Sequence, residues 1–453
     1  MQFKPIRQVS VYLNLEGNEK KLGTLAWSGK ERRAYFEYSA EFLASPFLIS
    51  PFHMKVAIGL IAAPRDPFDG LHGLFNDSLP DGWGRLLLDR RLQRAGIDYT
   101  QLTPIDRLSA VGRTGMGALT YIPDLPNDQE QPASADLDWF ADQLKLVQSE
   151  IDVADIDRLQ GAQGGSAGVR PKIMIGFNKA ENTCVLDYGQ PLDPGYERWI
   201  VKGPSSDDPQ EIGAEEKAYA LMAVAAGLQM ADTEVFDTRK GMRLFATKRF
   251  DRTPAGRIHM HTASGLLNAS HREASLNYEQ LHKLTRMMTR DSEEVLKMFR
   301  NMVFNVYAKN RDDHAKNHAF LMDGSGRWSL APAYDLTFSS GPGGEHSAAI
   351  SGEGRAPGMP HLLAVARGAS ISDQDAKDVI EQVRTAVDLW PQFAKTVRLS
   401  TSRTVEIDKI LNGNRPAQTL GVSYAPQGHT ISKPIRAIES VEDDDPDSFI
   451  PKR

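Results

Sequence analysis

The sequence predicts an α+β fold, with strands and helices mixed over residues 1–255 and helices dominant over residues 256–435. Two short runs near the N-terminus, Val9–Leu15 and Tyr35–Tyr38, have the pattern of half-buried strands. Further along, Ser292–Lys309 repeats its apolar residues at helical spacing and predicts a long amphipathic helix. The 453 residues exceed what one ordinary core holds, so we expect two or three packed units.

The remaining elements follow from local patterns in chain order. The leucines of Arg85–Ala95 suit one helix face, and Leu119–Ile122 is an apolar strand. Residues 123–137 are polar with three prolines, which is typical of a linker, and a helix is expected from there to about Gln160. The elements expected next are strands Lys172–Phe177 and Arg198–Lys202 with a loop at Asn178–Tyr196 between them, an alanine-rich helix at Glu211–Leu228, and a strand at Arg243–Phe250.

These patterns divide the chain into four segments, residues 1–124, 125–255, 256–435 and 436–453. The last segment carries the acidic run Glu442–Asp445 and two prolines, so we expect a disordered tail. The sequence contains no internal repeat.

The composition is that of a globular protein, with 41% hydrophobic and 25% charged residues. No stretch is apolar and long enough to span a bilayer, and the N-terminus lacks the apolar core of a signal peptide. The single cysteine, Cys184, excludes an internal disulfide, and we expect a cytoplasmic protein. The net charge of −6 offers no overall basic footprint, so any contact with DNA is expected to run mainly through a partner.

A glycine-rich loop, Gly161–Lys172, precedes the first strand of the second segment. Its four glycines within eight residues allow backbone N–H groups to turn toward an anion. The candidate nucleotide-contacting positions are Gly164, Gly165 and Gly168. An ordinary surface loop explains the same composition, so this loop gains weight only from the residues that follow.

Lys202 ends an apolar strand and is the candidate lysine for the α- and β-phosphates of a nucleotide. A lysine at such a position is costly unless its ammonium group has an anionic partner. We expect that partner to be Glu216 on the following helix, with the adjacent Glu215 as the alternative. A solvated strand end remains the alternative for Lys202 itself.

The strongest motif is Asn310–Asn317, directly after the amphipathic helix. An acid followed five residues later by asparagine matches a kinase catalytic loop, in which the acid orients the hydroxyl nucleophile and the asparagine binds Mg²⁺. We assign Asp312 as the base and Asn317 as a metal ligand, with Asp313 as the alternative base. For His314, proton transfer is weighed against a scaffolding role in the loop.

Asp335 lies 18 residues after Asn317, across a hairpin predicted to turn at 323–326. Kinases place their main Mg²⁺-binding aspartate after the catalytic loop and one hairpin. An aspartate buried beside Pro332 and Tyr334 would be costly without a cation, although a turn aspartate is the alternative. The motifs together predict phosphoryl transfer that uses ATP and Mg²⁺.

Taken together, these stretches resemble the HipA family of bacterial toxin kinases. The catalytic stretch Asp312–Asn317 has the form D-x-H-A-K-N, and Pro332–Asp335 has the form P-x-Y-D. The other matching stretches are Lys202, Arg249–Arg252 as R-F-D-R, Leu79–Asp81, and Gly112–Ala118 with its glycines and arginine. The resemblance covers roughly residues 5–420.

The resemblance implies a protein-kinase-like fold with an N-terminal α/β subdomain and a mostly helical C-terminal subdomain. It implies the toxin of a type II toxin–antitoxin system, a non-specific serine/threonine protein kinase that uses ATP and Mg²⁺. Its implied partners are a small helix-turn-helix, HipB-like antitoxin dimer, operator DNA mainly through that antitoxin, and a protein substrate such as an aminoacyl-tRNA synthetase. It also implies that Phe250 and His314 contact ATP and that Ser166, the only serine of the glycine-rich loop, is autophosphorylated.

Two positions depart from the family pattern. Gly165 stands where some relatives carry the loop serine, and Lys248 stands where some carry a glutamate at the hinge. Three other functions are open: a small-molecule or lipid phosphotransferase, a catalytically inactive co-repressor, and a metal hydrolase. The family-like N-terminal region argues against the first, and the complete set of catalytic residues argues against the second. The third is disfavoured because His314 is not part of an H-E-x-x-H motif.

Overall fold

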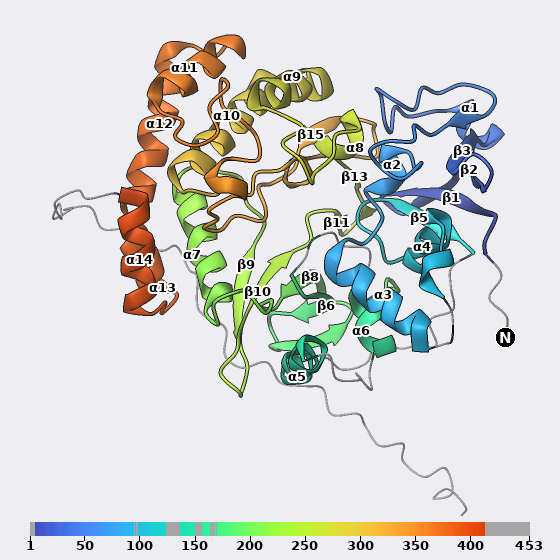
Figure 1. The fold of residues 1–453 in the computed structure, drawn as a ribbon, viewed down its shortest axis with the longest axis horizontal. Helices are drawn as coiled ribbons and strands as arrows, with labels where there is room; N and C mark the ends of the chain where they lie inside the picture. Colours follow the sequence, from blue (N-terminus) through green and yellow to red (C-terminus); the bar gives the residue numbers. More distant parts are fainter. Residues whose placement is uncertain are drawn as a thin grey trace, which may run out of the picture.

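The computed structural model describes residues 5–94, 96, 98–123, 136–149, 156–163, 168 and 170–412. The expected acidic tail and most of the expected linker lie outside these ranges, as do Gly164, Gly165 and Ser166. Figure 1 shows the N-terminal unit in blue on one side, a strand-rich centre in green, and the last helices in orange and red on the other side. This mixture confirms the predicted α+β class.

The N-terminal unit, residues 5–123, is built on an antiparallel sheet in the order β4-β3-β2-β1-β5. The predicted alternation along the first strand is confirmed, because Val9, Val11, Leu13 and Leu15 are all buried. The elements are β1 (Gln8–Leu15), β2 (Asn18–Ser28), β3 (Arg33–Tyr38), α1 (Ala40–Ala44), β4 (Ile61–Ala62), α2 (Gly73–Asn76), α3 (Gly82–Arg94), a 3-10 turn (Tyr99–Gln101), α4 (Pro104–Val111) and β5 (Leu119–Ile122).

The middle of the chain forms a second antiparallel sheet, in the order β7-β6-β8-β10-β9. Its elements, with the helices around it, are α5 (Leu137–Gln148), α6 (Ile156–Gln163), β6 (Lys172–Asn178), β7 (Thr183–Leu186), β8 (Glu197–Lys202), α7 (Ile212–Ala225), β9 (Thr233–Asp237) and β10 (Arg243–Lys248). The prediction of one loop over Asn178–Tyr196 is wrong. Thr183–Leu186 pairs with β6 as a strand, because Cys184, Val185 and Leu186 bury their side chains.

Helix α3 of the N-terminal unit joins the core of this second sheet. Trp83 and Leu87 of α3 are buried with Leu159 of α6 and Ile173 and Ile175 of β6. The helix expected to run to about Gln160 is instead two described helices, α5 and α6. The shared core places the N-terminal unit directly beside the start of β6.

The last part of the chain is mostly helical, as predicted, but it also contains a small sheet in the order β13-β14-β15. Its elements are β11 (Arg252–Thr253), β12 (Gly256–Arg257), β13 (His259–Thr262), α8 (Ala263–Leu267), α9 (Tyr278–Thr289), α10 (Ser292–Tyr307), β14 (Ala319–Met322), β15 (Trp328–Leu330), α11 (Met359–Gly368), α12 (Asp373–Asp388), α13 (Trp390–Thr396) and α14 (Thr401–Asn412), with 3-10 turns at Ala315–Asn317 and Pro342–Gly344. The hairpin predicted at 323–326 is confirmed as the β14–β15 connection.

Helix α10 delivers the chain to the catalytic motif. It begins after Asp291, whose side chain accepts a hydrogen bond from the Glu293 amide at 2.9 Å, and it buries Phe299, Met302 and Val303. The helix ends at Tyr307, three residues before Asn310. Within the described ranges, no helix has the length and apolarity to cross a membrane.

Candidate active site

A cavity of about 420 Å³ lies where the N-terminal unit, the second sheet and the helical part meet. All of the predicted site residues that the structure describes line it: Gly168, Lys202, Glu216, Phe250, Asp312, His314, Asn317 and Asp335. Residues predicted from motifs more than 100 positions apart are therefore brought to one place. Gly164, Gly165 and Ser166 lie outside the described residues.

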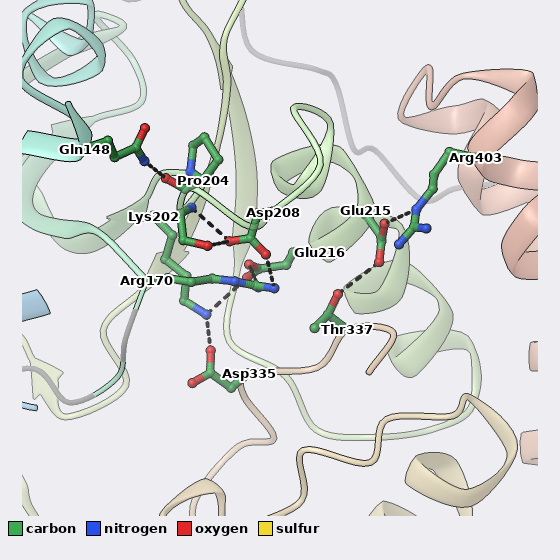
Figure 2. A network of polar contacts seen from close by, with 11 residues as sticks. Gln148, Arg170, Lys202, Pro204, Asp208, Glu215, Glu216, Asp335, Thr337 and Arg403 are labelled. Atoms are coloured by element: carbon green, nitrogen blue, oxygen red, sulfur yellow. Dashed lines mark hydrogen bonds and ion pairs between the residues drawn. The ribbon is translucent and has the colours of Figure 1, made fainter. Parts of the chain in front are cut away.

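Lys202 meets two carboxylates in this cavity. Its Nζ donates to Glu216 Oε2 at 3.1 Å and forms a short ion pair with Asp335 Oδ1. Burial alone would lower the pKa of Lys202, but Asp335 and Glu216 outweigh it and raise that pKa above its ordinary value. The lysine therefore stays charged, and Figure 2 shows its ammonium group between Glu216 and Asp335.

Glu215 points away from the cavity, although it is adjacent to Glu216 (Figure 2). Its carboxylate accepts hydrogen bonds from Arg403 Nε at 2.8 Å and from Thr337 Oγ1 at 3.3 Å. Consecutive helical residues face directions about 100° apart, so only one of the two glutamates can meet Lys202. In this structure that residue is Glu216.

Two further cations, Arg170 and Lys172, line the cavity and were not among the predicted nucleotide contacts. Lys172 lies opposite Lys202 in the β6–β8 register. Burial, with the nearby charge of Lys202, lowers the pKa of Lys172 to about 8, although Asp335 opposes this. The basic residues of Arg170-Pro171-Lys172, at the start of β6, were the one sequence signal that could have pointed to an anion-binding role. Their position in the cavity depends on strand register, which the sequence does not show.

Arg170 ties the end of the glycine-rich loop to the same carboxylates. Its Nη1 lies 2.5 Å from Glu216 Oε1 and its Nη2 lies 2.9 Å from Asp208 Oδ1. Gly168, just before it, has φ +111°, and a Cβ there would come within 2.5 Å of Lys172 Nζ. The described end of the loop therefore needs glycine and lies against the cavity.

The two neighbouring aspartates of the catalytic motif have opposite environments. Asp313 is 1% exposed, and its carboxylate accepts hydrogen bonds from Tyr278 Oη at 2.9 Å and the Ser347 amide at 2.8 Å, with His346 Nδ1 at 2.8 Å. The side chain of Asp312 is 58% exposed and opens into the cavity. Asp313 thus anchors the loop internally, whereas Asp312 is accessible to a substrate.

The pKa of Asp312 is raised above its ordinary value. Partial burial is the main cause, and the negative charges of Asp335 and Asp313 add to it, while His314 opposes them. His314 Nε2 lies 3.9 Å from Asp312 Oδ1. A raised pKa makes the Asp312 carboxylate a stronger proton acceptor than an aspartate in water.

Asn317 and Asp335 present oxygen atoms that suit Mg²⁺. The Asn317 amide nitrogen donates to the Asp312 carbonyl at 2.6 Å, which leaves its Oδ1 as the atom for a cation. Asp335 has φ +55°, a left-handed conformation rare for non-glycine residues and typical of functional sites. Burial would raise the pKa of Asp335, but Lys202, Lys172 and Arg170 bring it well below the ordinary value, so the carboxylate is ionised.

Within the described residues, no group of three or more His, Cys, Asp or Glu side chains forms an all-protein metal site. Mg²⁺ is commonly bound by one or two carboxylates together with substrate phosphates and water. The oxygen atoms of Asp335 and Asn317 are of the kind that such an ion uses.

The segment Arg249–Arg252 is hydrogen-bonded to the stretch Gly112–Ala118 of the N-terminal unit. Asp251 is fully buried and accepts hydrogen bonds from Arg249 Nη2 at 2.8 Å, from Arg252 Nη1 at 2.7 Å and from the Gly117 amide at 2.7 Å. Phe250, between the two arginines, lines the cavity. Two stretches that are separate in the sequence are thus joined by hydrogen bonds next to Phe250 in the chain.

The comparisons with known proteins match this chain to one family. A model of the HipA-like C-terminal domain matches residues 164–390, and a model of the HipA N-terminal domain matches residues 13–122. The putative kinase Y4dM of Sinorhizobium fredii is 27% identical over 297 residues. That alignment covers 60% of this chain and 66% of the relative, so the chain spans just under two thirds of the relative's length.

Among solved structures, HipA of Shewanella oneidensis MR-1, determined with HipB and its operator DNA, matches with a TM-score of 0.65. The match covers 89% of this chain and 95% of that chain, at 17% sequence identity. A likeness at this identity shows that the two chains share a fold.

Proposed function

This chain belongs to the HipA family, and on that premise we propose that it is an ATP- and Mg²⁺-dependent serine/threonine protein kinase. One observation carries the proposal: Lys202 pairs with both Glu216 and Asp335 in a cavity that Asp312 and Asn317 also line. These are the parts that phosphoryl transfer needs, namely a lysine for phosphates, an accessible acid and oxygen ligands for a cation.

Each side chain has a distinct task in this proposal. Lys202 binds the α- and β-phosphates, and Glu216 holds its ammonium group in place. Asp335 and Asn317 would hold Mg²⁺, which would supply positive charge next to the phosphates. Phe250 contacts the nucleotide base or sugar, His314 contacts the nucleotide from the catalytic loop, and Gly164, Gly165 and Gly168 approach the phosphates.

Asp312 receives the proton of the acceptor hydroxyl. The accessible carboxylate of Asp312 and its raised pKa favour this step. The carboxylate of Asp313, in contrast, is buried and already accepts hydrogen bonds from Tyr278 and Ser347. The acceptor oxygen forms its bond to the γ-phosphorus as the bond from that phosphorus to ADP breaks, and Lys202 helps to offset the negative charge on the phosphates.

We further propose that the chain is a toxin of a toxin–antitoxin system that acts in the cytoplasm. The solved relative with the same fold is a HipA–HipB–operator complex, which supports a HipB-like antitoxin as partner and operator DNA contacted mainly through it. A translation component such as an aminoacyl-tRNA synthetase is the proposed substrate, and Ser166 the proposed site of autophosphorylation. The division at residues 1–124, 125–255, 256–435 and 436–453 remains a proposal.

The test is intact-protein mass spectrometry of wild type and Asp312→Asn after incubation with ATP and Mg²⁺, alone and with a panel of aminoacyl-tRNA synthetases. Phosphate on Ser166 or on a synthetase, in wild type only, is the expected result. Phosphate on neither protein, from a preparation that binds ATP, would favour an inactive co-repressor over a kinase.

A further inference from the structure

The phrase Leu79–Asp81 has no task in the function proposed above, yet it places a carboxylate in the cavity. Asp81 immediately precedes α3, and its side chain is 22% exposed. Its Oδ2 lies 2.5 Å from Nζ of Lys316, a residue 235 positions further along the chain. Lys316 is nearly buried, with 6% of its side chain exposed, and Asp81 is its one carboxylate partner in the described part of the chain.

Lys316 stands inside the catalytic motif, between the proposed base and the proposed metal ligand. Its own carbonyl accepts a hydrogen bond from Tyr334 Oη at 2.5 Å, and Tyr334 is next to Asp335. The next residue, Asn317, donates to the Asp312 carbonyl at 2.6 Å and so closes the motif on itself. Lys316 is therefore held at its head group from the N-terminal unit and at its backbone from the metal-binding segment.

A second basic side chain, His271, lies near the Asp81 carboxylate, but it does not compete with Lys316 for it. His271 Nε2 lies 4.0 Å from Asp81 Oδ2, at the edge of ion-pair distance. Burial, followed by the charge of Lys316, lowers the pKa of His271 to about 4, so this ring is neutral at pH 7. A neutral His271 does not compete for the carboxylate as a cation would.

We propose that Asp81 is a positioning residue for phosphoryl transfer, whose ion pair with Lys316 holds the loop Asp312–Asn317 in its productive geometry. The proposal rests on the function proposed above, and it means that the N-terminal unit contributes a side chain that positions the catalytic loop. Its physical basis is that a nearly buried ammonium group without its carboxylate is costly, so the lysine would move and carry the loop with it. Small displacements of catalytic groups have large kinetic effects.

The test compares Asp81→Asn with Asp89→Asn. Asp89 is a matched control, because its carboxylate is 19% exposed and pairs with Arg107 at 2.8 Å within the N-terminal unit. Asp81→Asn should lower kcat by about 10- to 100-fold while nucleotide affinity stays within about twofold of wild type. Backbone hydrogen exchange of residues 312–318, measured without nucleotide, should become faster in Asp81→Asn and remain unchanged in Asp89→Asn.

Two further variants separate positioning from a general loss of structure. Asp81→Glu keeps the carboxylate and should recover much of the kcat lost in Asp81→Asn, and an equal loss in both variants would overturn the proposal. In Lys316→Met, adding Asp81→Asn should cost little more, because the pair is already broken. Fully additive losses would count against the ion pair as the cause.

The exchange measurement also distinguishes this proposal from the kinase proposal. If wild type transfers no phosphate but Asp81→Asn still loosens residues 312–318, the kinase function fails and the structural coupling stands. If exchange and kcat of Asp81→Asn both equal wild type, Asp81 does not position the loop, whatever the activity.

Discussion

Lys172 and Lys202 lie opposite each other on adjacent antiparallel strands, β6 and β8, and both side chains line the same cavity. Their two positive charges repel each other, but Glu216 and Asp335 supply negative charge beside Lys202. Asp208 and Glu216 do the same for the neighbouring Arg170. The cavity thus contains an ion network. Its cations come from β6, from β8 and from Arg170 shortly before β6, and they face the carboxylates of Glu216 on α7 and of Asp335. Such a network is suited to exchange some internal partners for the phosphates of a nucleotide.

The pKa of Lys172 predicts a pH dependence of nucleotide binding. Since that pKa is lowered to about 8, Lys172 is charged below pH 8 and becomes neutral above it. Loss of a cation weakens anion binding, so the Kd for ATP with Mg²⁺ should rise between pH 7.5 and 9.5, by up to about tenfold. Lys172→Arg keeps its charge over this range and should show a flat profile, measured by calorimetry at each pH. Matching profiles in the two proteins would contradict the assignment.

Asp312→Asn and Asp313→Asn should affect different properties. Asp312→Asn removes the proposed base and should lower kcat by about 10²- to 10⁴-fold, with Tm unchanged. Asp313→Asn disturbs a buried acceptor of several hydrogen bonds and should lower the free energy of unfolding by about 2–4 kcal/mol. Kinetics and thermal denaturation of both variants check this, and a reversed pattern would exchange their roles.

The adjacent glutamates of α7 offer a similarly matched pair. Glu216→Gln weakens the hold on Lys202 and should raise the Kd for ATP by about tenfold. Glu215→Gln disturbs the buried contact to Arg403 and should lower Tm with nucleotide affinity preserved in the folded protein. Nucleotide titration beside thermal denaturation separates the two effects, and an affinity loss confined to Glu215→Gln would show that the wrong glutamate was chosen.

Asp335→Asn should abolish the Mg²⁺ dependence of nucleotide binding. The substitution removes an ionised carboxylate that three cations stabilise, and an amide is a weaker ligand for Mg²⁺. The measurement is the Kd for ATP with Mg²⁺ and with EDTA. Wild type should lose affinity when EDTA is present, whereas the variant should bind equally weakly in both. A variant that retains the full Mg²⁺ effect would remove Asp335 from the metal site.

The sequence by itself determined the α+β class, the helix that leads into the catalytic motif, and the hairpin between Asn317 and Asp335. These features depend on local periodicity and turn chemistry, which neighbouring residues specify. It also supplied the candidate residues, because lysine, aspartate and asparagine in this order match a phosphoryl-transfer site. The strand β7 was missed, because Thr183–Leu186 is a short apolar run within a polar segment and resembles a loop.

The tertiary structure decided which of two neighbouring residues faces the cavity. Glu216 rather than Glu215 meets Lys202, and Asp312 rather than Asp313 is accessible, because these choices depend on the rotation of α7 and on distant hydrogen-bond donors. It also placed Lys172 opposite Lys202 through strand register. The contact of Asp81 with Lys316 joins residues 235 positions apart. Such a contact leaves no periodic signal in the sequence, since it depends on how parts of the chain that are distant in the sequence pack together.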